Sequence, residues 1–163
     1  MKLLSALLVF SVATAVHAQR RVAGAPPEKT VALTIALKAG SKVYNFNGEG
    51  KCTYGLASIY AMRAERWTAE RTGESPSAKL TVWKPAVGSD MLTLAFTIGD
   101  TRYSLNTVKV GGKGTPEGSG TVGIAREGAG GTFTISGTAG DGTPISGTVK
   151  CGAFSRPNEE GGL

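Results

Sequence analysis

The segment Gly131–Phe154, with the sequence GTFTISGTAGDGTPISGTVKCGAF, carries the clearest strand pattern in the chain and repeats the tetrapeptide ISGT. Side chains alternate between the faces of a strand, and residues paired across two antiparallel strands share a face. A two-residue turn at the Asp-Gly pair would mix apolar and polar side chains on both faces. A three-residue loop, Gly140–Gly142, instead pairs Phe133 with Val149 and leaves threonines and serines on the opposite face. We therefore predict a hairpin with one buried face, to which Cys151 belongs.

The chain has two cysteines, Cys52 and Cys151. An even number of cysteines in an exported chain indicates a disulfide bond. A metal site would need more soft ligands than two cysteines supply. We therefore predict one disulfide and no metal site. The bond would close a loop of about a hundred residues and stabilise the fold by roughly 4–5 kcal/mol in the chain-entropy model.

The N-terminal sequence MKLLSALLVFSVATAVHA places one basic residue, Lys2, before an apolar run that ends in small residues near Ala18. This pattern is typical of a secretory signal peptide cleaved after Ala18, and no later apolar run reaches the roughly 20 residues of a membrane span. We therefore expect an exported protein, periplasmic or extracellular. The expected organisation is a signal peptide at 1–18, a flexible basic arm at 19–29, a single all-β domain at 30–154 and a polar tail at 155–163.

Short alternations of apolar and polar residues, separated by glycine-rich turns, fill most of the domain. The strands expected before the last hairpin include Thr30–Lys38, Lys42–Asn47, Lys79–Lys84, Asp90–Ile98, Thr101–Val108 and Thr121–Arg126. A two-residue Gly99-Asp100 turn pairs Phe96 with Tyr103 and keeps the apolar side chains on one face. The loop Gly111–Gly120 has neither a GK[ST] ending nor a following helix, so it does not match a phosphate-binding loop.

The stretch Cys52–Arg71 is ambiguous, because its composition favours helix while its apolar spacing does not keep a helical stripe. We expect a loop or a short helix at Leu56–Ala61, followed by a hairpin with the strand Lys79–Lys84. Pairing Trp67 with Val82 places the apolar faces of both arms together. The other pairs of this register are Ala69 with Leu80, Glu70 with Lys79 and Arg66 with Trp83.

Together these segments predict an all-β domain of about eight or nine short antiparallel strands. The expected architecture is a Greek-key-like antiparallel β-sandwich, in which the disulfide joins the early part of the chain to its last strand. A β-barrel is the alternative arrangement of the same strands.

The only histidine, His17, lies within the predicted signal peptide. A mature chain without histidine has no Ser-His-Asp or Cys-His mechanism, and it lacks the commonest ligand for zinc, copper and haem. Paired carboxylates would suit a glycosidase, but turn and cross-strand positions account for most of the acids. The acids considered are Glu65, Glu70, Asp90, Asp100 and Asp141. We predict no catalytic residue and no cofactor, and favour a non-enzymatic protein while leaving the enzyme alternative open.

Trp83 falls on the polar face of its strand, with Arg66 opposite it in the predicted register. An exposed tryptophan beside an arginine is a typical anchor for a protein partner or a sugar ring. Burial of Trp83 under a loop or a second sheet is the alternative, because tryptophan is highly buried on average. The aromatics Tyr54 and Tyr60 and the Arg63–Arg66 pair would extend this surface, and packing around the Cys52 disulfide is the alternative for them. The candidate binding patch comprises Trp83, Arg66, Arg63 and Tyr60.

The chain has a formal net charge of +6, and removal of Lys2 with the signal peptide leaves 17 basic and 12 acidic residues. The basic excess lies in Arg20–Lys84, a distribution that suits an anionic polymer or serves ordinary solubility. We expect a secreted or periplasmic, non-enzymatic binding or accessory module that recognises a protein or a glycan. The alternatives are a polyanion-binding envelope protein and a small carboxylate-based hydrolase. The sequence leaves the ligand and the oligomeric state open.

Overall fold

A computed structural model of the chain describes residues 29–71 and 77–157. The predicted signal peptide lies outside the described residues, as do residues 19–28 of the predicted arm and residues 158–163 of the predicted tail. The described residues form nine strands and no helix. None of them forms a helix that is long and apolar enough to cross a membrane.

The nine strands form one antiparallel sheet in the order β6-β5-β4-β3-β2-β1-β9-β8-β7. Their bounds are β1 Val31–Ala39, β2 Lys42–Ile59, β3 Met62–Arg71, β4 Ala78–Pro85, β5 Met91–Ile98, β6 Thr101–Asn106, β7 Ser119–Glu127, β8 Gly130–Thr138 and β9 Pro144–Cys151. The predicted all-β, antiparallel, disulfide-linked fold is confirmed. It takes the form of the barrel alternative, a nearly closed barrel-like sheet. Strands β1 to β6 and strands β7 to β9 each pair in chain order, and the pairing of β1 with β9 joins the two groups.

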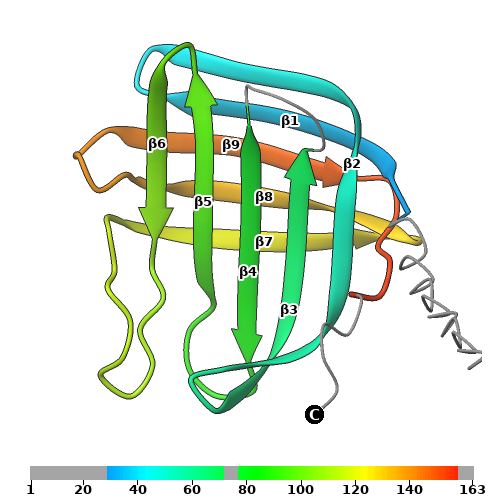
Figure 1. The fold of residues 1–163 in the computed structure, drawn as a ribbon, viewed down its shortest axis with the longest axis vertical. Helices are drawn as coiled ribbons and strands as arrows, with labels where there is room; N and C mark the ends of the chain where they lie inside the picture. Colours follow the sequence, from blue (N-terminus) through cyan, green and yellow to red (C-terminus); the bar gives the residue numbers. More distant parts are fainter. Residues whose placement is uncertain (1–28, 72–76, 158–163) are drawn as a thin grey trace, which may run out of the picture.

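The barrel is flattened into two layers, which explains why the pattern also resembles a sandwich. In Figure 1, β7, β8, β9 and β1 cross behind β3 to β6, and β2 curves from one layer to the other. The first half of β2 pairs with β1 and its second half with β3, and Gly50 belongs to both pairings. A Cβ atom at Gly50 would collide with Leu33 and lie 2.7 Å from the Glu70 carbonyl oxygen. Glycine therefore permits the close packing at this bend, where the strand expected to end at Asn47 instead continues.

The core lies between the two layers and is built from the inward-facing residues of the strands. Phe133 and Ile135 of β8 and Val149 of β9 face Leu80 and Phe96 across the barrel, and all five are at most 2% exposed. The remaining space between β1, β3, β4, β5 and β9 does not admit a water molecule. The barrel interior at this level is therefore a packed core, as expected for a barrel of this size.

The registers predicted for the three hairpins are confirmed. In the last hairpin Phe133 pairs with Val149, and Gly142, with a φ of 86°, ends the loop in the left-handed conformation. Phe96 pairs with Tyr103 in the β5–β6 hairpin, as the two-residue turn requires. All four predicted β3–β4 pairs also occur, including Trp67 with Val82. Burial of one face thus sets the register of each of these three strand pairs.

The predicted loop or short helix at Leu56–Ala61 is wrong. Strand β2 runs without interruption to Ile59, a two-residue turn follows at Tyr60 and Ala61, and β3 begins at Met62. Both turn residues have positive φ angles, 48° and 67°, as in a type I′ turn. The helical preference of alanine, methionine and arginine is overridden because β3 pairs with strands on both sides.

The predicted disulfide joins Cys52 of β2 to Cys151 of β9, with 6.2 Å between their Cα atoms. Strand β1 separates these two strands in the sheet, but it begins opposite Gly50 and so leaves Cys52 without a β1 partner. The chain after β9 fills this position, because the Ser155 amide donates a hydrogen bond to the Cys52 carbonyl and Ser155 forms a parallel bridge with Thr53. The start of the predicted polar tail is therefore part of the sheet.

Candidate functional site

Arg66 and Trp83 lie side by side on the outer face of the barrel. Their neighbours Trp67 and Val82 belong to the core, so alternation turns Arg66 and Trp83 outward. The Arg66 guanidinium carbon lies 5.8 Å from the centroid of the Trp83 ring, which is a cation–π contact. Both side chains are half-buried, and Trp83 is paired on its other side with Met91, which is 7% exposed. Trp83 is therefore neither a core residue nor a freely exposed ring.

Tyr60 and Arg63 lie at the end of the β2–β3 hairpin, at one end of the barrel. The Tyr60 side chain is 50% exposed at the β2–β3 turn, and Arg63 is exposed and paired with Ser58. Arg63 and Arg66 are three residues apart, so they project from opposite faces of β3. The four predicted residues thus occupy two adjoining places, the Arg66–Trp83 pair on the outer face and Tyr60 with Arg63 at the hairpin end.

The structure adds two exposed apolar side chains to this end. Four large hydrophobic side chains are exposed among the described residues: Val43, Leu56, Tyr60 and Val87. Leu56 is 71% exposed near the end of β2, and Val87 is 85% exposed in the loop between β4 and β5. The pairing of Ala64 with Pro85 brings that loop to the β2–β3 turn, and Figure 1 shows both at the same end of the barrel. We call Leu56, Tyr60, Arg63 and Val87 the tip surface.

Sequence reasoning missed Leu56 and Val87 for different reasons. The sequence pattern predicts a loop or short helix at Leu56–Ala61, and this expectation does not indicate that Leu56 lies at the exposed end of a hairpin. Val87 stands in the short sequence PAVGSD, where an apolar residue between proline and glycine was the available signal. A large apolar side chain in a turn-forming segment has no strand partner to cover it, so Val87 stays exposed.

A cluster of aromatic rings closes the inside of the barrel near the disulfide. Tyr54 stacks on Trp67 with 3.8 Å between the ring centroids, and Phe154 meets Trp67 edge-on at 5.0 Å. The Arg126 guanidinium lies over these rings, 5.1 Å from the Trp67 centroid. Burial raises the pKa of the Tyr54 phenol above its ordinary value, and the hydrogen bond that it donates to Glu65 adds to the rise. These rings and the Arg126 side chain pack against one another at this end of the core. Tyr54 stays protonated at neutral pH.

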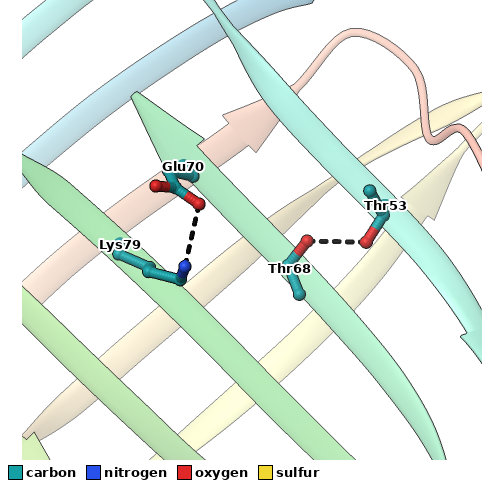
Figure 2. Close-up of polar contacts among 4 residues, drawn as sticks. All are labelled: Thr53, Thr68, Glu70 and Lys79. Atoms are coloured by element: carbon teal, nitrogen blue, oxygen red, sulfur yellow. Dashed lines mark hydrogen bonds and ion pairs between the residues drawn. The ribbon is translucent and has the colours of Figure 1, made fainter. Parts of the chain in front are cut away.

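The acids considered for catalysis are mostly engaged in local contacts. Glu70 forms an ion pair with Lys79 at 3.0 Å, next to the 2.6 Å hydrogen bond between the Thr53 and Thr68 hydroxyls on the same outer face (Figure 2). Asp90 lies 3.6 Å from Lys84.

The Asp141 carboxylate accepts a hydrogen bond from the Thr143 amide within the β8–β9 loop, and this bond holds the pKa of Asp141 below its ordinary value. Asp141 is thus explained as a turn residue, in agreement with the sequence pattern.

No group of three or more histidine, cysteine, aspartate or glutamate side chains within residues 29–71 and 77–157 is placed to hold a metal ion.

The fold and the site define the class of this molecule as a disulfide-linked, nearly closed antiparallel barrel with a packed core and an apolar tip. Comparison with protein-family models, with curated proteins and with solved structures finds no match for this chain. Its function is therefore argued from its own residues.

The turn at the tip surface leads to a first prediction. Tyrosine and alanine are costly at positive φ, where asparagine and glycine are favoured in a type I′ turn. The double change of Tyr60→Asn and Ala61→Gly is expected to raise the free energy of unfolding by about 1–2 kcal/mol. Urea unfolding would show a higher midpoint with an unchanged slope. An unchanged or lower midpoint would contradict a strained turn.

Proposed function

We propose that the protein is an exported, non-enzymatic binding module that recognises a protein partner through the tip surface. The observation that carries this proposal is the gathering of Leu56, Tyr60 and Val87 at one end of the barrel. Large apolar side chains that project together from a packed domain are typical of interaction sites. Export is supported by the disulfide and by the signal-like N-terminal sequence.

The chemistry of the tip surface favours a protein over a glycan. Tyrosine and arginine are enriched in protein interfaces and often supply much of the binding energy. A sugar ring, in contrast, stacks on an open aromatic face. Trp83 is half-buried and carries Arg66 against its ring, so it offers little free face for stacking. Leu56 and Val87 suit the aliphatic and aromatic side chains of a partner protein.

The strain in the Tyr60–Ala61 turn gives independent support. Backbone held in a sparsely populated conformation tends to occur where it serves function. Here it presents a half-exposed tyrosine at the outermost point of the hairpin, where Asn-Gly would form the same turn at lower cost. The proposal therefore explains why a less stable turn occupies this position.

The test compares partner capture by the mature chain and by tip variants. The tip variant carries both Leu56→Ser and Val87→Ser. It is expected to bind the partner at least about tenfold more weakly than wild type, because each lost apolar contact contributes roughly 1 kcal/mol or more. Partners would be captured from envelope and culture fluid, washed at high salt, and their affinities then measured with the purified partner.

Val43 supplies the matched control for this experiment. It is 49% exposed, close to the value for Tyr60, but lies next to the β1–β2 turn at the opposite end of β2. The Val43→Ser variant is expected to bind like wild type. Equal binding by the tip variant, or equal loss in the Val43→Ser variant, would contradict the proposal. Retention that disappears as salt rises would instead indicate an anionic polymer.

A further inference from the structure

The sheet does not close completely, and β7 is one of its two open edges. Strand β7 has β8 as its only partner in the described sheet. Just before β7, Glu117 and Asn106 exchange two backbone hydrogen bonds of 2.8 Å, which joins the start of this strand to the end of β6. Beyond that bridge, no backbone hydrogen bond in the described chain joins residues 120–127 to any strand other than β8. Alternate residues of an edge strand present their N–H and C=O groups outward, available for another strand.

This edge lacks the features that usually prevent pairing. Edge strands are commonly short or interrupted by proline, or they carry charged side chains. Strand β7 spans nine residues, SGTVGIARE, and contains no proline. Its two charged residues come last and are already engaged, Arg126 over the Trp67 ring and Glu127 in a 3.0 Å ion pair with Lys150. The part of the edge before Arg126 is uncharged.

We propose that β7 pairs with β7 of a second copy of this chain, antiparallel, with the twofold axis passing at Gly123. This inference concerns a surface other than the tip surface and does not depend on the proposed function. The dyad at Gly123 is the position at which all nine residues of both strands find partners. It would join the two four-stranded layers β1-β9-β8-β7 into one continuous sheet.

The side chains of β7 complement themselves in this register. Val122 and Ile124 face the barrel interior, and they would lie opposite Ile124 and Val122 of the second copy, which extends the apolar face across the junction. Thr121 would lie opposite Ala125 of the second copy on the outer face. A slip by one residue would place apolar side chains opposite outward-facing ones, so burial selects this family of registers. Self-complementarity favours a second copy over an unrelated extended peptide.

Gly123 offers a direct test, because it is exposed and a Cβ atom there would meet nothing within 4 Å. Its φ also lies outside the left-handed range, so a side chain is accommodated in the single molecule. At the dyad, Gly123→Lys would place two ammonium groups opposite each other. Like charges at directly opposed positions oppose strand pairing.

The mature, disulfide-bonded chain would be measured by analytical ultracentrifugation across a concentration series. The wild type is expected to reach the mass of a dimer, and the Gly123→Lys and Gly123→Asp variants are each expected to raise the dimer dissociation constant about tenfold or more. An equimolar mixture of the two variants is expected to recover the dimer, because lysine then faces aspartate. The Thr148→Lys variant is the control, since Thr148 is exposed on the same outer face but on β9. Circular dichroism would establish that every variant is folded.

Each outcome decides the proposal. A wild type that stays monomeric at every concentration overturns it, and so does a Gly123→Lys variant that dimerises like the wild type. Loss of the dimer in both the Gly123→Lys and the Thr148→Lys variants would show a general charge effect and also overturn it. Failure of the mixed variants to associate would overturn the dyad at Gly123. Dimerisation of the wild type and of the mixture alone supports it.

Discussion

Replacement of both Cys52 and Cys151 by alanine is expected to lower the free energy of unfolding by about 4–5 kcal/mol. The disulfide closes a loop with a sequence separation of 99, and such a cross-link mainly restricts the unfolded chain. Both sulfur atoms are buried, so the replacement also removes packed atoms from the core. A domain of this length is stable by only about 5–15 kcal/mol, so the variant is expected to be close to unfolding.

Urea unfolding of the double alanine variant and of reduced wild type would measure this effect. The two samples are expected to lose similar stability, because both lack the cross-link. The single Cys52→Ala variant leaves Cys151 as a free thiol. It is expected to lose as much stability as the double variant, because it also lacks the cross-link. A loss of less than about 1 kcal/mol in every sample would contradict the chain-entropy account.

Replacement of Trp67 by alanine is expected to cost about 3–5 kcal/mol. Trp67 is 4% exposed and lies among Tyr54, Phe133, Phe154 and the Arg126 guanidinium, so its removal leaves a large void in the core. The Trp67→Phe variant is expected to retain most of this stability. Its ring fills much of the space, and the indole nitrogen of Trp67 has no hydrogen-bond partner among the described residues to be lost.

Trp83 provides a control on the adjacent strand for the same type of substitution. It is half-buried on the outer face, and the Trp83→Ala variant is expected to lose about 1–2 kcal/mol. Near-ultraviolet circular dichroism would show the loss of the packed indole in each variant, and urea unfolding would give the two free energies. Equal losses at the two positions would contradict the assignment of Trp67 to the core and Trp83 to the outer face.

Part of the candidate site was predictable from the sequence because it depends on cross-strand register. Arg66 meets Trp83 because burial of Trp67 and Val82 fixes the pairing of β3 with β4. The tip surface was not predictable in the same way. The exposure of Val87 depends on which elements meet at the end of the barrel, and alternation along a single strand contains no information about that.

The turn between β2 and β3 is a second feature that could not be predicted from the sequence. Sequence rules assign positive φ to glycine and asparagine, so Tyr60 and Ala61 gave no signal for a type I′ turn. The turn forms because β3 is paired along its length with both β2 and β4. Pairing on two sides stabilises the hairpin by more than the turn costs, and tertiary contacts thereby override local preference.

The sequence by itself determined the all-β class, the disulfide and the registers of three hairpins. The disulfide follows from an even cysteine count in a chain with an export-type N-terminal sequence. The class and the registers follow from short-range rules, since the two strands of each hairpin are neighbours in the sequence and one face of each must be buried. Only the tertiary structure decided that β1 pairs with β9, that β2 bends at Gly50 and that β6 and β7 remain as open edges. Pairing of β1 with β9 joins segments more than a hundred residues apart, and the backbone hydrogen bonds that form it are the same for any side chains. The arrangement is therefore selected by the packing of the whole core, in which every inward-facing residue must find space at once.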